Sequence, residues 1–411
     1  MKNCRVPSYN NTILKNAVII SILCLLLQQE SIGYSLGNNL DTNTNKYQSR
    51  FERQMKLLER AKESTKVNHP DSIANGEKRQ LFKDEDNNYN IEDNSLEQPT
   101  TSFYIPDRPL SPPFPNGLNG GSIITLPPSE HFMLDEKFAD NQLILPHRDI
   151  HVWLPSDYYK YPDMKFPVLY CHDGQNVMDD KTSWTGYSWR MAGAFTRLAE
   201  RRMLKTTETH SPPIIVMIPC ATENLGFISR RHLEYGDITQ PFAQAHADFV
   251  ALTLKPLIDS RFRTLADCKN TAVIGSSLGG QASLHMVLRY PDLFGKVACL
   301  SPAFQPGILT SVASSSIEMW DDKVIYMDNG GDVDDKKVDW IDIQDHLSSQ
   351  HWWNPGYWFL DTQLQPGIDA MKLAFDVRGI NYTYKKFPGG RHNERGWANR
   401  IHEPLLALYG L

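Results

Sequence analysis

The sequence has no concentrated positive charge. Its 42 lysines and arginines are outnumbered by 48 aspartates and glutamates, which gives a formal net charge of −6 over 411 residues. Proteins that bind nucleic acids usually carry a basic stripe or patch that meets the phosphate backbone. We therefore expect no nucleic-acid partner. The hydrophobic share of 41% is enough for a large core in one or two domains.

Long hydrophobic runs are also scarce. One lies at residues 17–27, after three lysines and arginines and before small residues of the kind that a signal peptidase accepts. This order predicts a secretory signal peptide over residues 1–33 and a secreted protein with no membrane span once the signal is removed. Because the run is short for a membrane span, an uncleaved signal anchor is the alternative. Asn381 begins an Asn-Tyr-Thr sequon, which predicts a glycoprotein if the chain enters a eukaryotic secretory route.

Cysteine is limited to six residues, two of which lie in the signal segment. Cys171, Cys220 and Cys299 lie at the ends of apolar, strand-like runs, and Cys268 lies in a polar turn. A secretory route permits disulfides, but cysteines in strands are often small buried hydrophobic residues. We therefore assign no disulfide bridge.

Large apolar residues are few between residues 34 and 102, where Asn, Asp, Glu, Lys, Ser and Gln dominate. Such a segment buries too little apolar surface to offset the entropy cost of ordering it. We expect a disordered linker or pro-segment there, with one possible helix at 51–61. Residues 103–411 form the expected folded domain, and no internal repeat is present.

The folded part alternates strand and helix patterns. Residues 149–154 alternate apolar and polar side chains, whereas 166–171 and 213–218 are continuous apolar runs typical of strands covered on both faces. Further strands are expected at 296–300, 323–327 and 382–387. Helical spacing of apolar residues occurs at 189–202, 243–263 and 367–377, and a final helix ends near Tyr409. Strand and helix in alternation predict the α/β class, with a mostly parallel sheet covered by helices on both faces.

A serine turn stands between a strand and a helix within residues 271–290. Its centre reads Gly275-Ser-Ser-Leu-Gly279, a G-x-S-x-G pattern in which the middle serine, Ser277, occupies a strained corner. The Leu278 N–H at the helix start is suited to hold a developing oxyanion. A purely structural Gly/Ser turn is the alternative, but the position between strand and helix favours a nucleophile.

A serine nucleophile needs a base to take its proton. Among the thirteen histidines, His392 follows the last strand in a glycine-rich loop, which suits a base. His172 lies in Cys-His-Asp-Gly-Gln-Asn, a turn that we expect to supply a second oxyanion donor, the backbone N–H of Gln175. His285 lies on the helix behind the serine, where we expect it to be packed or solvated.

Three motifs together resemble the putative-esterase family of α/β hydrolases: Gly275-Ser-Ser-Leu-Gly-Gly280, His172-Asp-Gly-Gln-Asn176 and His392-Asn-Glu-Arg-Gly-Trp397. That family includes enterochelin esterases, feruloyl and other carbohydrate esterases, S-formylglutathione hydrolase and mycolyltransferases. The resemblance covers roughly residues 149–411. It implies an α/β-hydrolase fold with Ser277 as nucleophile, His392 as general base and acid, and the Leu278 and Gln175 N–H groups as oxyanion hole. It implies no cofactor.

The acid that should pair with His392 has two candidates. The chain departs from the family pattern after Gly331, where residues 332–359 form an insertion with four tryptophans. The resemblance places the acid just before a Leu-Gln-Pro-Gly helix start, which favours Asp361, with Asp332 as the alternative. The aspartates of the insertion lack the spacing of a calcium loop, so no metal is expected. We expect the insertion to cap the serine, or else to pack as a satellite cluster.

The sequence therefore predicts a secreted serine carboxylester hydrolase that acts through an acyl-enzyme on a small-molecule or carbohydrate ester. Two alternatives remain open, an acyltransferase on the same fold and a non-catalytic binding protein on a hydrolase scaffold. Arg230, Arg231 and Tyr235 line the pocket in one interpretation. In another, the two arginines make surface ion pairs.

Overall fold

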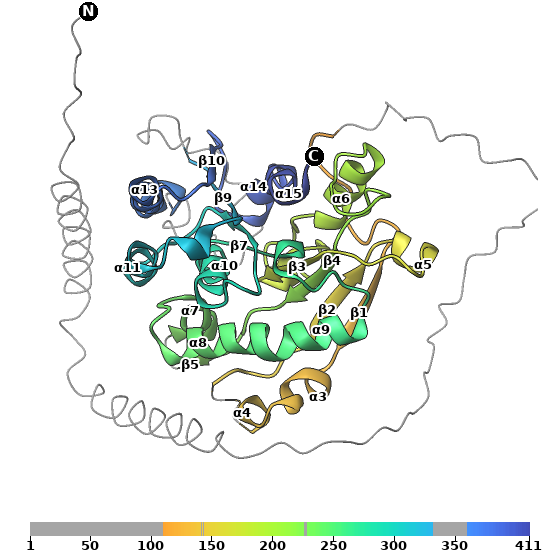
Figure 1. Ribbon diagram of the computed structural model, residues 1–411, viewed down its shortest axis with the longest axis horizontal. Coiled ribbons are helices and arrows are strands. Elements are labelled where there is room, and N and C mark those ends of the chain that lie inside the picture. The colour runs from red at the N-terminus through yellow and green to blue at the C-terminus, as the bar shows by residue number, and fades with distance from the viewer. Residues whose placement is uncertain (1–109, 141, 143, 226–227, 332–359) are drawn as a thin grey trace, which may run out of the picture. The chain divides into compact units, whose positions relative to one another are not determined.

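A computed structural model describes residues 110–140, 142, 144–225, 228–331 and 360–411 (Figure 1). The expected signal peptide at 1–33, the expected linker or pro-segment at 34–102 with its possible helix, and the insertion at 332–359 with Asp332 all lie outside the described residues. Within the described residues, no helix is both long enough and apolar enough to cross a membrane.

Eight strands form one sheet in the order β1-β2-β4-β3-β7-β8-β9-β10 (Figure 1). They are β1 (Ser122–Leu126), β2 (Ile150–Leu154), β3 (Val168–His172), β4 (Ile214–Ile218), β7 (Thr271–Ser276), β8 (Lys296–Leu300), β9 (Val324–Asn329) and β10 (Thr383–Lys386). A separate two-stranded hairpin pairs β5 (Asn224–Leu225) with β6 (Ile228–Ser229). β1 was not predicted from the sequence, and four of its five residues are partly or fully exposed.

The sheet is parallel from β4 to β10. The pairs β3·β4, β3·β7, β7·β8, β8·β9 and β9·β10 are parallel, whereas β1·β2 and β2·β4 are antiparallel. Because the parallel strands run the same way, their carboxyl ends meet at one edge of the sheet. The turns that follow β3, β7, β8, β9 and β10 therefore open at that edge.

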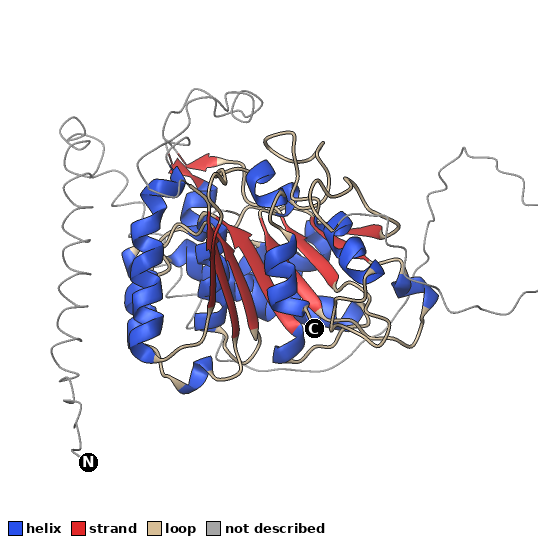
Figure 2. Cartoon of the chain, turned by 90° about the horizontal axis from the view of Figure 1, so that it is seen from above, coloured by secondary structure: helices blue, strands red, loops and turns tan. Residues whose placement is uncertain are grey.

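Helices cover both faces of the sheet (Figure 2). One face carries α6 (Met191–Glu200), α14 (Glu394–Ala398) and α15 (His402–Tyr409). The other carries α7 (Arg230–Tyr235), α8 (Pro241–Asp248), α9 (Lys255–Arg261), α10 (Leu278–Arg289), α11 (Pro306–Ser314) and α13 (Leu360–Arg378). This arrangement confirms the α/β-hydrolase fold with a mostly parallel sheet.

Shorter helical turns connect these elements. They are α3 (Pro128–His131), η1 (Phe132–Leu134), α4 (Glu136–Ala139), α5 (Asp157–Lys160), η2 (Gly174–Asn176), η4 (Cys268–Asn270) and η5 (Glu318–Trp320).

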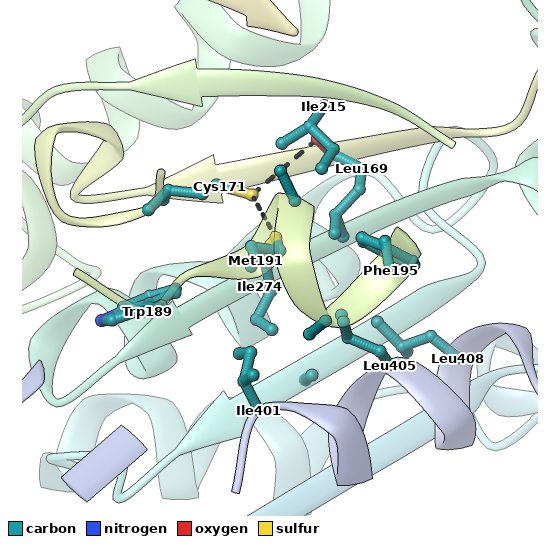
Figure 3. Packing of buried hydrophobic residues seen from close by; sticks show 14 of the residues in the cluster. Leu169, Cys171, Trp189, Met191, Phe195, Ile215, Ile274, Ile401, Leu405 and Leu408 are labelled. Carbon is teal, nitrogen blue, oxygen red and sulfur yellow. Dashed lines mark hydrogen bonds between the residues drawn. The ribbon is translucent and has the colours of Figure 1, made fainter. Parts of the chain in front are cut away.

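Side-chain alternation along the strands builds the core. Leu169 and Cys171 of β3 point to the same face and pack against α6 and α15 through Met191 and Leu405 (Figure 3). Tyr170, between them, points to the other face, and its ring centroid lies 5.9 Å from that of Phe294. Continuous apolar runs are thus explained by burial on both faces. The four described cysteines are free.

The expected helix at 243–263 is interrupted. The chain forms α8, then a π-helical turn η3 (Phe249–Leu254), and then α9. Pro256 lies at the start of α9 and has no N–H to give to the carbonyl of Leu252. A wider turn, in which each carbonyl pairs five residues ahead, allows the helix to continue past that proline.

The expected helix at 367–377 is longer than predicted. Helix α13 begins at Leu360, so Pro366 lies inside it and Asp361 lies in its first turn. The prediction that Asp361 lies in a loop, before a helix start at 364–367, is wrong. Asn329, at the end of β9, donates one hydrogen bond to Asp361 in this first turn and one to Gln365 in the next turn. These long-range contacts hold the start of α13 against the sheet, and no local pattern shows them.

Candidate active site

Ser277 occupies a strained corner between β7 and α10. Its backbone has φ 56° and ψ −125°, a conformation that residues with side chains rarely adopt. Two glycines leave room for the corner. A Cβ added to Gly275 would lie 2.2 Å from the Gly279 carbonyl oxygen, and one added to Gly279 would lie 2.9 Å from an oxygen of Asp173. The G-x-S-x-G spacing therefore reflects backbone crowding at this turn.

The corner is bonded to the end of β8 and to the loop that follows it. The Ser277 N–H donates to the Leu300 carbonyl at 2.9 Å, and the Ala303 N–H donates to the Ser277 carbonyl at 3.0 Å. With both backbone groups of Ser277 bonded, its half-buried side chain is the part left to act.

His392 and Asp361 form a hydrogen-bonded pair. His392 Nδ1 lies 2.9 Å from Asp361 Oδ1, and both side chains are almost fully buried. Burial alone would raise the pKa of Asp361, but the hydrogen bond and charge of His392 outweigh it, so that pKa lies below its usual value. An ionised carboxylate only accepts, so Nδ1 carries a proton, and in the neutral form of the imidazole Nε2 is left with a lone pair. That is the tautomer that a general base needs.

Asp361 is held by the end of strand β9. Asn329 Nδ2 donates to the Asp361 carbonyl at 2.9 Å and to Gln365 Oε1 at 2.7 Å. A Cβ added to Gly330 would lie 2.5 Å from Asp361 Oδ2, so only a glycine leaves room for the carboxylate there. No role was predicted for Asn329 or Gly330, although both belong to the Asp-Asn-Gly-Gly turn, residues 328–331.

The loop that carries His392 is tied to that same turn. The Gly331 N–H donates to the Gly390 carbonyl at 3.0 Å, and the Gly389 N–H donates to the Gly331 carbonyl at 2.8 Å. The backbones cross closely, since a Cβ on Gly330 would lie 2.7 Å from the Gly390 carbonyl oxygen. The acid and the histidine are therefore positioned by one shared backbone contact.

Trp397 connects the histidine loop to the serine side of the sheet. Its ring meets the His392 ring edge-on at 5.0 Å, and its Nε1 donates to Ser301 Oγ at 3.4 Å. Arg400 donates to the same hydroxyl at 2.7 Å and pairs with Asp328 at 3.3 Å. Ser301 directly follows Leu300, the residue that accepts from the Ser277 N–H. Ser301 and Arg400 have no signature in the sequence that we recognised.

The two expected oxyanion donors lie at helix starts. Leu278 is the first residue of α10, where an N–H has no partner within the helix. Gln175 lies in η2, and its side-chain Oε1 accepts from the Cys220 N–H at 3.1 Å, which fixes the residue against the end of β4. Neither N–H donates to a backbone carbonyl in the part of the chain that the structure describes.

Asp173 and Arg231 make a two-bonded ion pair beside this loop. Asp173 has φ 54°, and its two oxygens accept from Arg231 Nε and Nη2, each at 2.7 Å. The guanidinium also lies over the rings of Trp184 and Tyr235, at 5.6 and 5.4 Å. The expected surface ion pair is wrong for Arg231, because its pair with Asp173 is largely buried. That Arg230, Arg231 and Tyr235 line the pocket stays a prediction.

His172 and His285 are packed rather than exposed. His172 Nδ1 meets Ser283 Oγ at 2.9 Å, and its Nε2 meets His246 Nε2 at 3.1 Å. Burial lowers the pKa of His172 and of His285 to about 4, so both are neutral near pH 7. Among the described residues, no group of histidine, cysteine and carboxylate side chains could hold a metal ion.

Comparison with known proteins identifies a family. The family model described as "Putative esterase" matches residues 146–408. The uncharacterized protein YjcH of Bacillus subtilis (strain 168) is 26% identical over 188 residues, which cover 46% of this chain and 69% of YjcH.

Two solved structures are similar at low identity. Enterochelin esterase from Shigella flexneri is 17% identical with a TM-score of 0.47, over 74% of this chain and 62% of that one. A ferulic acid esterase is 15% identical with a TM-score of 0.45, over 70% of this chain and 98% of that one. Because the family model matches well over half of the 411 residues, this protein belongs to the putative esterase family and is a carboxylic ester hydrolase.

Proposed function

We propose that the protein hydrolyses carboxylic esters through a triad of Ser277, His392 and Asp361. The observation that carries the proposal is the 2.9 Å hydrogen bond between His392 Nδ1 and Asp361 Oδ1, which orients a buried imidazole at the edge of the sheet where the strained Ser277 turn also opens. A positioned imidazole is what converts a serine hydroxyl into a nucleophile.

The reaction has two halves. Ser277 Oγ attacks the ester carbonyl and forms a C–O bond, while His392 Nε2 takes the hydroxyl proton. The tetrahedral intermediate collapses, the bond to the alcohol breaks, and the imidazolium returns the proton to the leaving alcohol. Water then attacks the acyl-enzyme with His392 again as base, which releases the acid and restores Ser277.

The charge that develops on the carbonyl oxygen needs donors. We assign that role to the backbone N–H groups of Leu278 and Gln175, which lie at the start of α10 and in η2. A donor of this kind contributes roughly 10²–10³-fold to turnover in serine hydrolases. Asp361 stabilises the imidazolium that forms in each half-reaction.

The substrate class that we propose is a small-molecule or carbohydrate ester met outside the cell. The N-terminal signal pattern supports a secreted protein, and Asn381 of the sequon is exposed just before β10, where a glycan has room. Expression in a eukaryotic host tests both proposals. Recovery of the protein from the medium would support secretion, and a mass loss when that protein is treated with an N-glycosidase would support glycosylation.

A fluorophosphonate probe tests the triad because it labels only an activated serine. We expect wild-type protein to label and to hydrolyse short-chain aryl esters, and Ser277→Ala and His392→Ala to do neither. Ser276→Ala is the matched control, because Ser276 is buried in β7 one residue away and should keep both activities.

Two results would contradict the proposal. Absence of labelling in the wild type would indicate a binding protein on a hydrolase scaffold. Labelling lost in Ser276→Ala and kept in Ser277→Ala would show that the turn is misassigned. Product analysis with added acceptor alcohols then separates hydrolysis from acyl transfer.

A further inference from the structure

A buried carboxyl connects the two loops that carry the proposed catalytic groups. Glu394, which is only 5% exposed, accepts a hydrogen bond from Asn176 Nδ2 at 2.9 Å across 218 residues of sequence. Asn176 directly follows Gln175, and Glu394 lies two residues after His392. The mechanism above gives neither side chain a role.

Asn176 is fully engaged in its own loop. Its Oδ1 accepts from Ser183 Oγ at 3.3 Å and from the Trp184 N–H at 3.2 Å, and its backbone carbonyl accepts from the Trp189 N–H at 2.8 Å. The bond to Glu394 uses the Nδ2 amide group of the same side chain. Any movement of η2, and with it of the Gln175 N–H, would strain this set of bonds.

Glu394 is rigid with respect to His392. It is the first residue of α14, whose N-terminus is capped by Asn393 Oδ1 accepting from the Gly396 N–H at 2.8 Å. The same helix carries Trp397, whose ring lies 5.0 Å from the His392 ring. The carboxyl therefore couples the position of the histidine loop to that of the loop that carries the Gln175 N–H.

Burying a carboxyl carries a free-energy cost. Burial raises the pKa of Glu394 to about 7, although its own backbone N–H, the Thr185 hydroxyl and the charge of Arg231 lower it, and the charge of Asp173 adds to the increase. The guanidinium of Arg231 is bonded to Asp173 instead, and no ion pair joins Glu394 to another cation among the described residues.

We propose that Glu394 is a positioning residue that acts through Asn176 to hold the Gln175 N–H in place against the oxyanion while His392 moves the proton. The inference rests on the proposed function. Its effect should appear where charge develops, in kcat and in the binding of tetrahedral mimics, rather than in the binding of the ground-state ester.

The first test uses a double-mutant cycle. Glu394→Ala, Asn176→Ala and the double variant are assayed for kcat and KM on one aryl ester and for inhibition by a trifluoromethyl ketone, which forms an oxyanion adduct. We expect each single variant to lose about 10–100-fold in kcat and in inhibitor affinity, with KM changed less than threefold. The double variant should lose no more than Asn176→Ala alone, because Asn176→Ala already removes the bond that Glu394 makes.

Conservative variants keep the test decisive if alanine destabilises the fold. Glu394→Gln retains an acceptor oxygen at the same distance and should keep at least a third of wild-type kcat. Glu394→Asp withdraws the carboxylate by one methylene and should lose as much as Glu394→Ala. Glu403→Ala is the matched control, because Glu403 forms a more exposed ion pair with Lys385 and should leave kcat unchanged.

Several outcomes would overturn the inference: additive losses in the cycle, a loss confined to KM, full activity in Glu394→Ala, or a Glu394→Gln variant as impaired as Glu394→Ala. Failure of the proposed function is distinguishable, because the wild-type protein would then neither label with the fluorophosphonate nor hydrolyse the ester.

Discussion

Asn329 donates a hydrogen bond to the backbone carbonyl of Asp361 at 2.9 Å, across 32 residues of sequence. The donor is the last residue of β9, and the acceptor lies in the first turn of α13. This bond fixes the backbone of Asp361, and the carboxylate on that backbone bonds to His392. The outer strands of the sheet thus determine the geometry of the proposed base.

Replacing Asp361 by asparagine should lower kcat by about 10⁴-fold with little change in KM. An asparagine amide can donate to Nδ1, which would place the imidazole proton on Nε2 and remove the base. Asp369→Asn is the matched control, because Asp369 is exposed on the same helix α13. Steady-state kinetics on one ester measures kcat and KM of both variants. Normal turnover in Asp361→Asn would exclude Asp361 as the triad acid.

Gly330→Ala should displace the acid and the histidine loop from each other. The added methyl group would lie 2.5 Å from Asp361 Oδ2 and 2.7 Å from the Gly390 carbonyl oxygen, so the acid and the histidine loop must separate. We expect a loss of at least tenfold in kcat and a destabilisation of about 1–3 kcal/mol. Chemical denaturation and kinetics measure the two effects. An unaltered kcat would mean that the crossing of these loops does not position the pair.

Acid should destabilise the fold through buried histidines. Burial lowers the pKa of His131, His172 and His285 to about 4, whereas each histidine takes up a proton near pH 6.5 when the chain unfolds. The unfolded state binds more protons between these values, so stability is complete above pH 6.5 and falls towards pH 4. Each histidine contributes about 1.4 kcal/mol per pH unit at most.

Urea unfolding at pH 7 and pH 5.5 measures this loss. His131→Gln should reduce the pH dependence, because a glutamine can still donate to the Leu126 carbonyl that His131 Nε2 meets at 3.1 Å, without titrating. Equal free energies of unfolding at the two pH values would contradict the prediction.

Glu394 should act in the opposite direction. Its pKa rises from 4.5 to about 7 on folding, so the folded state binds the extra proton, and the stability that this group contributes is lost as pH rises from 4.5 to 7. Glu394→Gln should therefore gain stability relative to wild type at pH 8 compared with pH 5, by roughly 3 kcal/mol at most. A difference in free energy of unfolding that does not vary with pH would show that Glu394 keeps an ordinary pKa.

Local patterns were sufficient for the parallel strands and for the serine turn. Continuous apolar runs indicated the buried strands, and the glycines around Ser277 indicated a crowded corner, because both depend on neighbours within a few residues. The helix at 367–377 was predicted too short, since the Leu-Gln-Pro-Gly segment reads locally as a start. The first turn at Asp361 forms because Asn329 bonds to it from the sheet.

The sequence by itself determined the α/β class, the order of the motifs and the family. Only the tertiary structure decided which groups meet: Asp361 with His392, Asp173 with Arg231, and Glu394 with Asn176. These pairs are 31, 58 and 218 residues apart. A carboxylate has the same local signature whether it is solvated or paired, because its partner is brought to it by the packing of the parallel strands and not by its neighbours in the chain.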